Sequence, residues 1–167
     1  MRDTFKKCRS NFRKLQLAAS ALLALSAPLA AAGPFEGWAG IWRGDGAITM
    51  ANGAAERLTC RADVTQSDSD SFQQRLRCAS DTYRVLIDAA VNHAGGRVTG
   101  TWRDTNSGVS GNLAGRLTGG RMDANVQGSA FAAEITMTSR GDQRAFVIRP
   151  GQTDVQEVQV QLRKAAR

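Results

Sequence analysis

The chain has 167 residues, with 22 Lys and Arg, 15 Asp and Glu and a formal net charge of +7 at pH 7. Residues 1–32 hold six of the basic residues and one of the acidic ones, so residues 33–167 are close to neutral. The high overall charge therefore gives no reason to expect a nucleic-acid partner, and the remaining 135 residues suit one domain.

Residues 1–32 have the pattern of a secretory signal peptide. A basic stretch is followed by the short apolar run "LQLAASALLALSAPLAAA", and small residues at Ala30 and Ala32 mark a cleavage site before Gly33. A retained membrane anchor is the alternative, but a membrane span needs about 20 apolar residues and Pro28 interrupts this run. We predict a cleaved leader at 1–32, one domain at 33–167, a periplasmic or secreted location and no integral membrane association.

Beyond the leader, apolar and polar residues alternate over most of the chain, which predicts short strands. The alternating runs cover residues 38–50, 56–65, 71–80, 82–93, 98–102, 109–117, 122–126, 131–137, 146–148 and 158–162. Turns rich in Gly, Asn, Asp and Ser separate them at hairpin spacing. The sequence therefore predicts an all-β fold with an antiparallel sheet of roughly eight to ten strands.

Glycine recurs on the apolar parity, as in "VTGTW" (98–102) and "VSGNLAGRL" (109–117). Small barrels fill their interior by alternating small and large inward side chains, and glycine permits sharp coiling. We expect glycine to relieve crowding at Gly40, Gly44, Gly100, Gly111 and Gly115. This pattern predicts a small antiparallel up-and-down β-barrel, with a flat two-sheet sandwich as the alternative.

Two cysteines follow the leader, Cys60 and Cys78, and both are equally distant from Ser69. A hairpin that turns at Ser69 places them opposite each other, within the separation that a disulfide tolerates. Export to an oxidising compartment favours such a bond, and two buried free thiols are the alternative. We predict one intrachain disulfide, Cys60–Cys78.

Gly40-Ile41-Trp42 opens the first strand, and Gly100-Thr101-Trp102 repeats the pattern. A short G-x-W motif at this position in a secreted barrel resembles the calycin group, which includes lipocalins and avidins. The resemblance implies a cup that holds a small ligand, and it implies that Arg163 on the last strand packs over Trp42.

Few residues could carry catalysis or bind a metal. His93, the only histidine, could act as a general base or a metal ligand, but it has no partner set at a recognisable spacing and fits an exposed hairpin position. Asp68 and Asp70 lack the remaining ligands of a calcium loop. We predict no catalytic residue, no metal site and no cofactor.

Basic side chains on neighbouring predicted strands could form a positive stripe, at Arg57, Arg61, Arg75, Arg77 and Arg84. Alternating acidic residues weaken this stripe, and nearby aromatic stacking partners are few, which argues against binding of single-stranded nucleic acid.

The leading hypothesis is a non-enzymatic protein that binds a small ligand in the barrel mouth. The candidate lining residues are aromatic, and filling of the core is the alternative role for each of them: Trp38, Trp42, Tyr83, Trp102 and Phe131. A second hypothesis is an inhibitor or docking protein that acts on a secreted or envelope enzyme through loops such as "QSDSD" or "SRGDQ". A third is an outer-membrane barrel with its apolar parity facing lipid.

Overall fold

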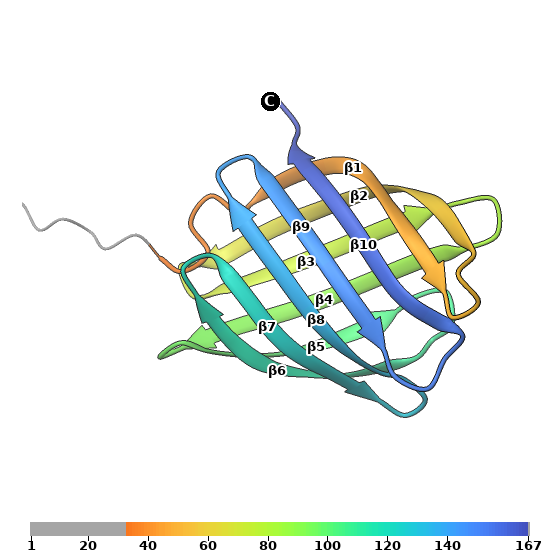
Figure 1. The fold of residues 1–167 in the computed structure, drawn as a ribbon. Helices are drawn as coiled ribbons and strands as arrows, with labels where there is room; N and C mark the ends of the chain where they lie inside the picture. Colours follow the sequence, from red (N-terminus) through yellow and green to blue (C-terminus); the bar gives the residue numbers. More distant parts are fainter. Residues whose placement is uncertain (1–32, 167) are drawn as a thin grey trace, which may run out of the picture. The chain divides into compact units, whose positions relative to one another are not determined.

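The structure, a computed structural model, describes residues 33–166. Within this range the chain forms ten antiparallel strands that pair in chain order, and the first pairs with the last to close a barrel (Figure 1). The strands are β1 (Gly40–Met50), β2 (Ala55–Asp68), β3 (Ser71–Ala79), β4 (Arg84–Ala94), β5 (Arg97–Asp104), β6 (Ser110–Thr118), β7 (Arg121–Gly128), β8 (Ala132–Arg140), β9 (Gln143–Pro150) and β10 (Val155–Lys164).

This topology confirms the predicted all-β, up-and-down barrel. The flat sandwich is wrong, because each of the ten described strands is paired on both sides. The predicted leader and its cleavage site lie outside the described residues. Among residues 33–166, no helix has the length and apolar character needed to cross a membrane.

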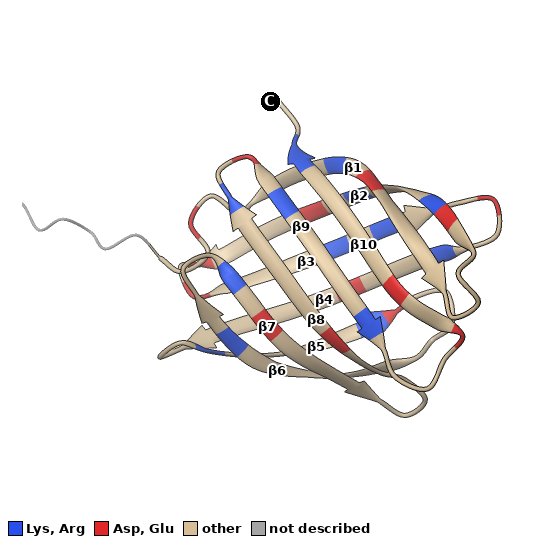
Figure 2. Cartoon of the chain, in the orientation of Figure 1, with Lys and Arg blue, Asp and Glu red and all other residues tan. Residues whose placement is uncertain are grey.

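The apolar parity of every strand faces the interior. β2 is typical: Leu58, Cys60 and Ala62 are buried, while Thr59 and Arg61 between them are exposed. Most charged residues of 33–166 therefore lie on the outer wall (Figure 2), and Arg144 is a buried exception. A lipid-facing barrel requires the reverse arrangement, so the outer-membrane hypothesis does not fit this structure.

The predicted disulfide is present. Cys60 and Cys78 are direct cross-strand partners on β2 and β3, and their sulfur atoms lie 2.06 Å apart. Both side chains face the interior and are buried. The bond thus joins the two strands of one hairpin from inside the barrel.

The inward glycines have a more specific cause than side-chain crowding. A Cβ atom at Gly111 would collide with the backbone carbonyl of Gln127, and one at Gly115 would collide with that of Asp123, both on β7. Glycine is needed there because the neighbouring strand approaches too closely for any side chain. Gly40 differs, because its φ of 130° is a conformation that side chains rarely adopt.

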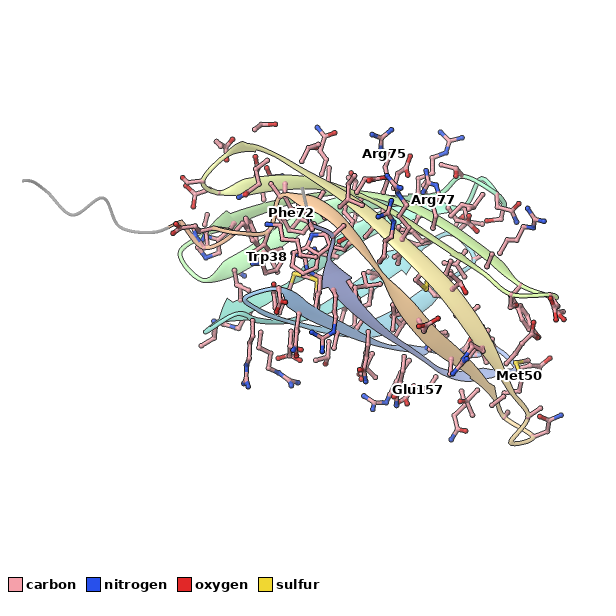
Figure 3. The ribbon with its side chains drawn as sticks, turned by 90° about the horizontal axis from the view of Figure 1, so that it is seen from above. Trp38, Met50, Phe72, Arg75, Arg77 and Glu157 are labelled. Carbon is pink, nitrogen blue, oxygen red and sulfur yellow. A yellow bond between two sulfur atoms is a disulfide. The ribbon has the colours of Figure 1, made fainter. Side chains whose placement is uncertain are left out.

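One end of the barrel is covered by residues 33–39, which precede β1. Phe35 and Trp38 are buried there, with their ring centroids 4.8 Å and 5.2 Å from that of Phe72 on β3. We name this the closed end and the opposite one the open end. Figure 3 shows Trp38 and Phe72 together near the closed end and Met50 at the open end.

Candidate functional site

The two ends of the barrel differ in how solvent reaches the interior. Eleven hydrophobic side chains pack against the core but stay partly exposed, and all lie at the middle of the barrel or toward its open end: Met50, Tyr83, Val85, Ile87, Ala89, Val109, Phe131, Ile135, Ile148, Val155 and Val158. At the closed end, by contrast, Phe35 and Trp42 are fully buried. Solvent therefore reaches inward-facing apolar side chains near the open end but not at the closed end.

Three of the five predicted lining residues lie at the open end. Tyr83, in the β3–β4 turn, points its hydroxyl group at the sulfur of Met50, 3.5 Å away. Trp102 on β5 packs edge to face against Phe131 of the β7–β8 turn, with ring centroids 5.5 Å apart. Both pairs combine side chains from segments that are distant in sequence, and together they form aromatic walls of the open end.

Among the buried polar atoms of residues 33–166 that have no hydrogen-bond partner, two belong to one row of the barrel interior. They are Nε1 of Trp102, a donor, and Oε1 of Gln74, an acceptor. Ala89 pairs with both residues, so Gln74 and Trp102 stand two strands apart in one row with only a methyl group between them. Buried polar atoms are normally hydrogen-bonded, so an unpaired donor and acceptor in one row are free to contact a bound molecule.

The other two predicted lining residues, Trp38 and Trp42, lie in the closed end. Trp42 donates a hydrogen bond from Nε1 to the carbonyl oxygen of Trp38, at 3.0 Å. Both rings are at most 4% exposed. Their surroundings are those of core residues, and the structure does not bring them together with Tyr83, Trp102 and Phe131.

The residue that covers Trp42 was not the predicted one. Arg163 faces outward and is exposed, because its inward neighbours on β10 are Leu162 and Lys164. Instead, the guanidinium carbon of Arg144 on β9 lies 4.0 Å from the centroid of the Trp42 ring. The prediction failed because it used position in the chain, whereas inward or outward orientation depends on strand parity.

Arg144 is buried, and no carboxylate among residues 33–166 forms an ion pair with it. It is 2% exposed, its Nη2 lies 3.4 Å from the carbonyl oxygen of Trp38, and its Nε and Nη1 atoms have no hydrogen-bond partner among residues 33–166. Burial lowers the pKa of Arg144 to about 9. The guanidinium group is thus still charged at neutral pH, and the faces of Trp42 and Trp38 offer it cation–π contacts.

His93 is less exposed than predicted. Its Nε2 accepts a hydrogen bond from the backbone N–H of Gly96 at 3.0 Å, and its ring packs against Phe35 with centroids 6.1 Å apart. Its Nδ1 lies 3.5 Å from a carboxylate oxygen of Asp70. These contacts give His93 a structural role, tying the β4–β5 turn to the residues that cover the closed end.

Sequence reasoning missed Gln74 and the aliphatic residues of the open end, such as Ile148. Gln74 lies on the inward parity between Phe72 and Leu76, and a polar residue at that position is a signal that could have been used. Which end is open could not be found in this way, because alternation is the same at both ends of a strand.

Comparisons with known proteins give the fold and no family. No protein-family model and no curated protein matches the chain. An S-type phycobiliprotein lyase from Guillardia theta is similar in structure, with a TM-score of 0.58 and 12% identity over 77% of this chain and 89% of that one. A de novo designed fluorescence-activating β-barrel has a TM-score of 0.45 and 11% identity over 76% of this chain and 93% of that one. At these identities the likeness to the lyase shows a shared barrel fold.

Proposed function

We propose that this protein is an exported, non-enzymatic binding protein of the calycin type, which holds a small apolar ligand in the open end of its barrel. The observation that carries the proposal is the exposure of inward-facing apolar side chains at that end and not at the other. Small-molecule sites are concave, mostly apolar and supplied with a few placed polar groups. The aromatic side chains of Tyr83, Trp102 and Phe131 supply the walls.

The unpaired atoms define the ligand further. The N–H of Trp102 can donate a hydrogen bond to an acceptor on the ligand, and the amide oxygen of Gln74 can accept one from a donor on the ligand. The row that holds Gln74, Ala89 and Trp102 contains no charged residue, so a neutral ligand fits better than an ion. We therefore favour a neutral, largely apolar molecule that carries a carbonyl or similar acceptor.

Export is supported by the leader pattern of residues 1–32 and by the disulfide, since such bonds persist in oxidising compartments. The neighbour named a lyase adds no chemistry to this chain, because a likeness at 12% identity extends to the fold alone.

The test is titration with Nile red, a neutral planar dye with a carbonyl acceptor, followed by its fluorescence. Ile148 and Val147 are adjacent on β9 and face opposite sides of the wall, so Ile148→Gln and Val147→Gln form a matched pair. We expect saturable binding at one site, a Kd raised at least about tenfold by Ile148→Gln through the cost of a buried amide, and no change from Val147→Gln.

Trp102→Phe keeps an aromatic ring but removes the N–H donor, so a smaller loss of affinity is expected from it. Absence of saturable binding, or equal losses from Ile148→Gln and Val147→Gln, would contradict the proposal. That result would favour a protein that acts through its outer surface.

A further inference from the structure

Arginine side chains form one continuous row across the outer wall. The row, which we name the arginine belt, consists of Arg77 on β3, Arg61 on β2, Arg43 on β1, Arg163 on β10 and Arg140 on β8, with Gln143 of β9 between the last two. Each neighbour in this row is a direct cross-strand partner of the next. Figure 2 shows the basic positions on these strands, and Figure 3 shows Arg77 pointing outward.

The belt differs from the stripe that the sequence predicted. Only Arg61 and Arg77 belong to both, because Arg75 lies in the next row, opposite Asp63 and Asp88. Arg43 and Arg163 are brought beside each other only where β1 pairs with β10 to close the barrel.

Such a row does not help the fold. Directly opposite residues on antiparallel strands have Cα atoms about 5 Å apart, and like charges at that distance are destabilising. Three successive Arg–Arg pairs, Arg77–Arg61, Arg61–Arg43 and Arg43–Arg163, repeat this cost. A function that offsets this cost would explain the row, and binding of an anionic partner is such a function.

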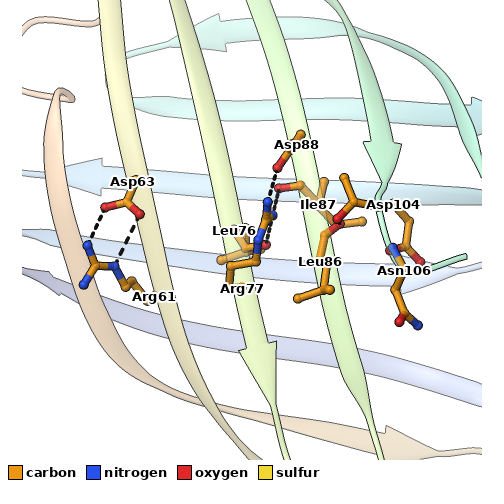
Figure 4. Close-up of polar contacts among 10 residues, drawn as sticks. Arg61, Asp63, Leu76, Arg77, Leu86, Ile87, Asp88, Asp104 and Asn106 are labelled. Atoms are coloured by element: carbon orange, nitrogen blue, oxygen red, sulfur yellow. Dashed lines mark hydrogen bonds and ion pairs between the residues drawn. The ribbon is translucent and has the colours of Figure 1, made fainter. Parts of the chain in front are cut away.

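Two of the five belt arginines form ion pairs with acidic residues. Arg61 bonds to Asp63 at 3.0 Å, and Arg77 bonds to Asp88 at 2.6 Å (Figure 4). Hydrogen bonds from Arg61, with the nearby charges of Arg75 and Arg43, lower the pKa of Asp63.

The other three belt arginines, Arg43, Arg140 and Arg163, are exposed and form no ion pair with any residue in 33–166. These three arginines also line a groove of about 920 Å³ on the outer wall over β1, β2, β8, β9 and β10. Its remaining charged residues balance, with Arg57 and Arg144 against Asp45 and Glu56, while Gln143, Gln159 and Gln161 supply neutral donors and acceptors. The groove is thus a polar channel with unpaired guanidinium groups along one side.

We propose that the arginine belt binds a linear acidic polysaccharide. Guanidinium forks bind carboxylate and sulfate groups in bidentate fashion, and the belt offers them at the spacing of one strand, a length similar to that of one sugar ring. Amides of the groove match sugar hydroxyls. This site is separate from the open end and does not depend on the small-ligand proposal.

Two other anionic partners fit less well. Bases of single-stranded nucleic acid need aromatic platforms, yet every aromatic residue of 33–166 belongs to the interior core or packs against it. A flat anionic membrane touches one side of a barrel, whereas the belt crosses six neighbouring strands of ten. A flexible chain can follow such a curved path.

The test compares two double variants of the full chain. Arg43→Gln with Arg163→Gln removes two unpaired belt residues. Arg97→Gln with Arg116→Gln is the matched control, because Arg97 and Arg116 are also exposed cross-strand partners, on β5 and β6. Both variants lose the same charge and are otherwise identical to the parent, so differences between them report on position alone.

Binding is measured against polygalacturonate, which carries carboxylates, and dextran sulfate, which carries sulfates, at several salt concentrations. We expect the belt variant to bind about tenfold more weakly than the parent. The slope of log K against the logarithm of the salt concentration should become less steep by about two units, because two arginine contacts are lost. The Kd of the control variant should stay within about twofold of that of the parent. Tighter binding to polygalacturonate would indicate that the belt prefers carboxylates, and tighter binding to dextran sulfate would indicate that it prefers sulfates.

Equal losses in both variants, or no binding by the parent protein, would overturn the proposal. Tighter binding to oligo(dT) or to phosphatidylglycerol vesicles than to either polysaccharide would also overturn it. Both variants are expected to melt no lower than the parent, because each removes a like-charge pair from the surface.

Discussion

The guanidinium carbon of Arg144 lies over the Trp42 ring, 4.0 Å from its centroid, and 4.7 Å from the ring centroid of a second tryptophan, Trp38. Trp38 belongs to the segment that covers the closed end, and Trp42 opens the first strand. A buried cation thus connects the cover of the barrel to its wall.

Substitutions at Arg144 test whether its charge or its volume matters for folding. Arg144→Met keeps most of the volume and removes a buried charge that has no carboxylate partner among residues 33–166, so we expect a variant at least as stable as the parent. Arg144→Ala leaves a cavity beside Trp42 and is expected to lower the free energy of unfolding by about 2 kcal/mol. Urea unfolding followed by tryptophan fluorescence measures both. A Met variant clearly less stable than the parent would show that the cation–π contacts outweigh the cost of burying the charge.

The disulfide joins residues 18 positions apart. Loss of a crosslink that closes a loop of this size costs about 3 kcal/mol, which corresponds to about 10 °C in Tm for a domain of this length. We expect Cys60→Ala with Cys78→Ala to show this loss by calorimetry. Reductant should lower the Tm of the parent protein and leave that of the double variant unchanged, and a parent insensitive to reductant would argue against the bond.

Gly128 makes room for Trp102. A Cβ atom at Gly128 would lie 3.0 Å from Cζ2 of Trp102 and 2.6 Å from the carbonyl oxygen of Ser110. Gly128→Ala is therefore expected to destabilise the protein by about 1–3 kcal/mol and to change its tryptophan emission. If the Trp102 contact carries the cost, the penalty becomes smaller in a Trp102→Leu background. An unchanged penalty in this double-mutant cycle would assign the cost to the Ser110 carbonyl alone.

Asp63 is expected to link stability to acid and to salt. Its folded pKa lies below the ordinary value of 3.8, mainly because Arg61 donates hydrogen bonds to it. A lowered folded pKa means that this contribution is complete above about pH 4 and is lost as the pH falls through the folded pKa. Asp63→Asn should therefore be less stable than the parent at neutral pH, and the difference should vanish in strong acid.

The same variant removes a negative charge beside the arginine belt, so its defect should be larger at low salt than at high salt, where charges are screened. Thermal melts across pH and salt measure both effects. A defect independent of both would rule out an electrostatic cause.

Export predicts a definite mass for the natural protein. Purified from its source organism, the chain is expected to begin at Gly33 and to be lighter by two hydrogens than the reduced sequence 33–167, as intact-mass spectrometry would measure. A native mass above the denatured mass would reveal a retained ligand. A full-length chain with residues 1–32 still attached would contradict the predicted cleavage.

The local sequence pattern was enough to predict the barrel. Alternation assigns each residue to a face, hairpin spacing makes neighbouring strands antiparallel, and the symmetric spacing about Ser69 places Cys60 opposite Cys78. These features depend on residues that are close in sequence. They were therefore predictable without any knowledge of how the sheet closes.

Tertiary structure decided where the accessible interior and the charged surface lie. The segment that contains Phe35 and Trp38 covers one end of the barrel and not the other. The alternation of apolar and polar residues cannot show which end is covered. Arg43 and Arg163 become neighbours only because β1 pairs with β10, 120 residues further along the chain. Period-2 alternation assigns the face of a side chain but not its neighbour across a closure, because that neighbour depends on the number, tilt and register of all ten strands.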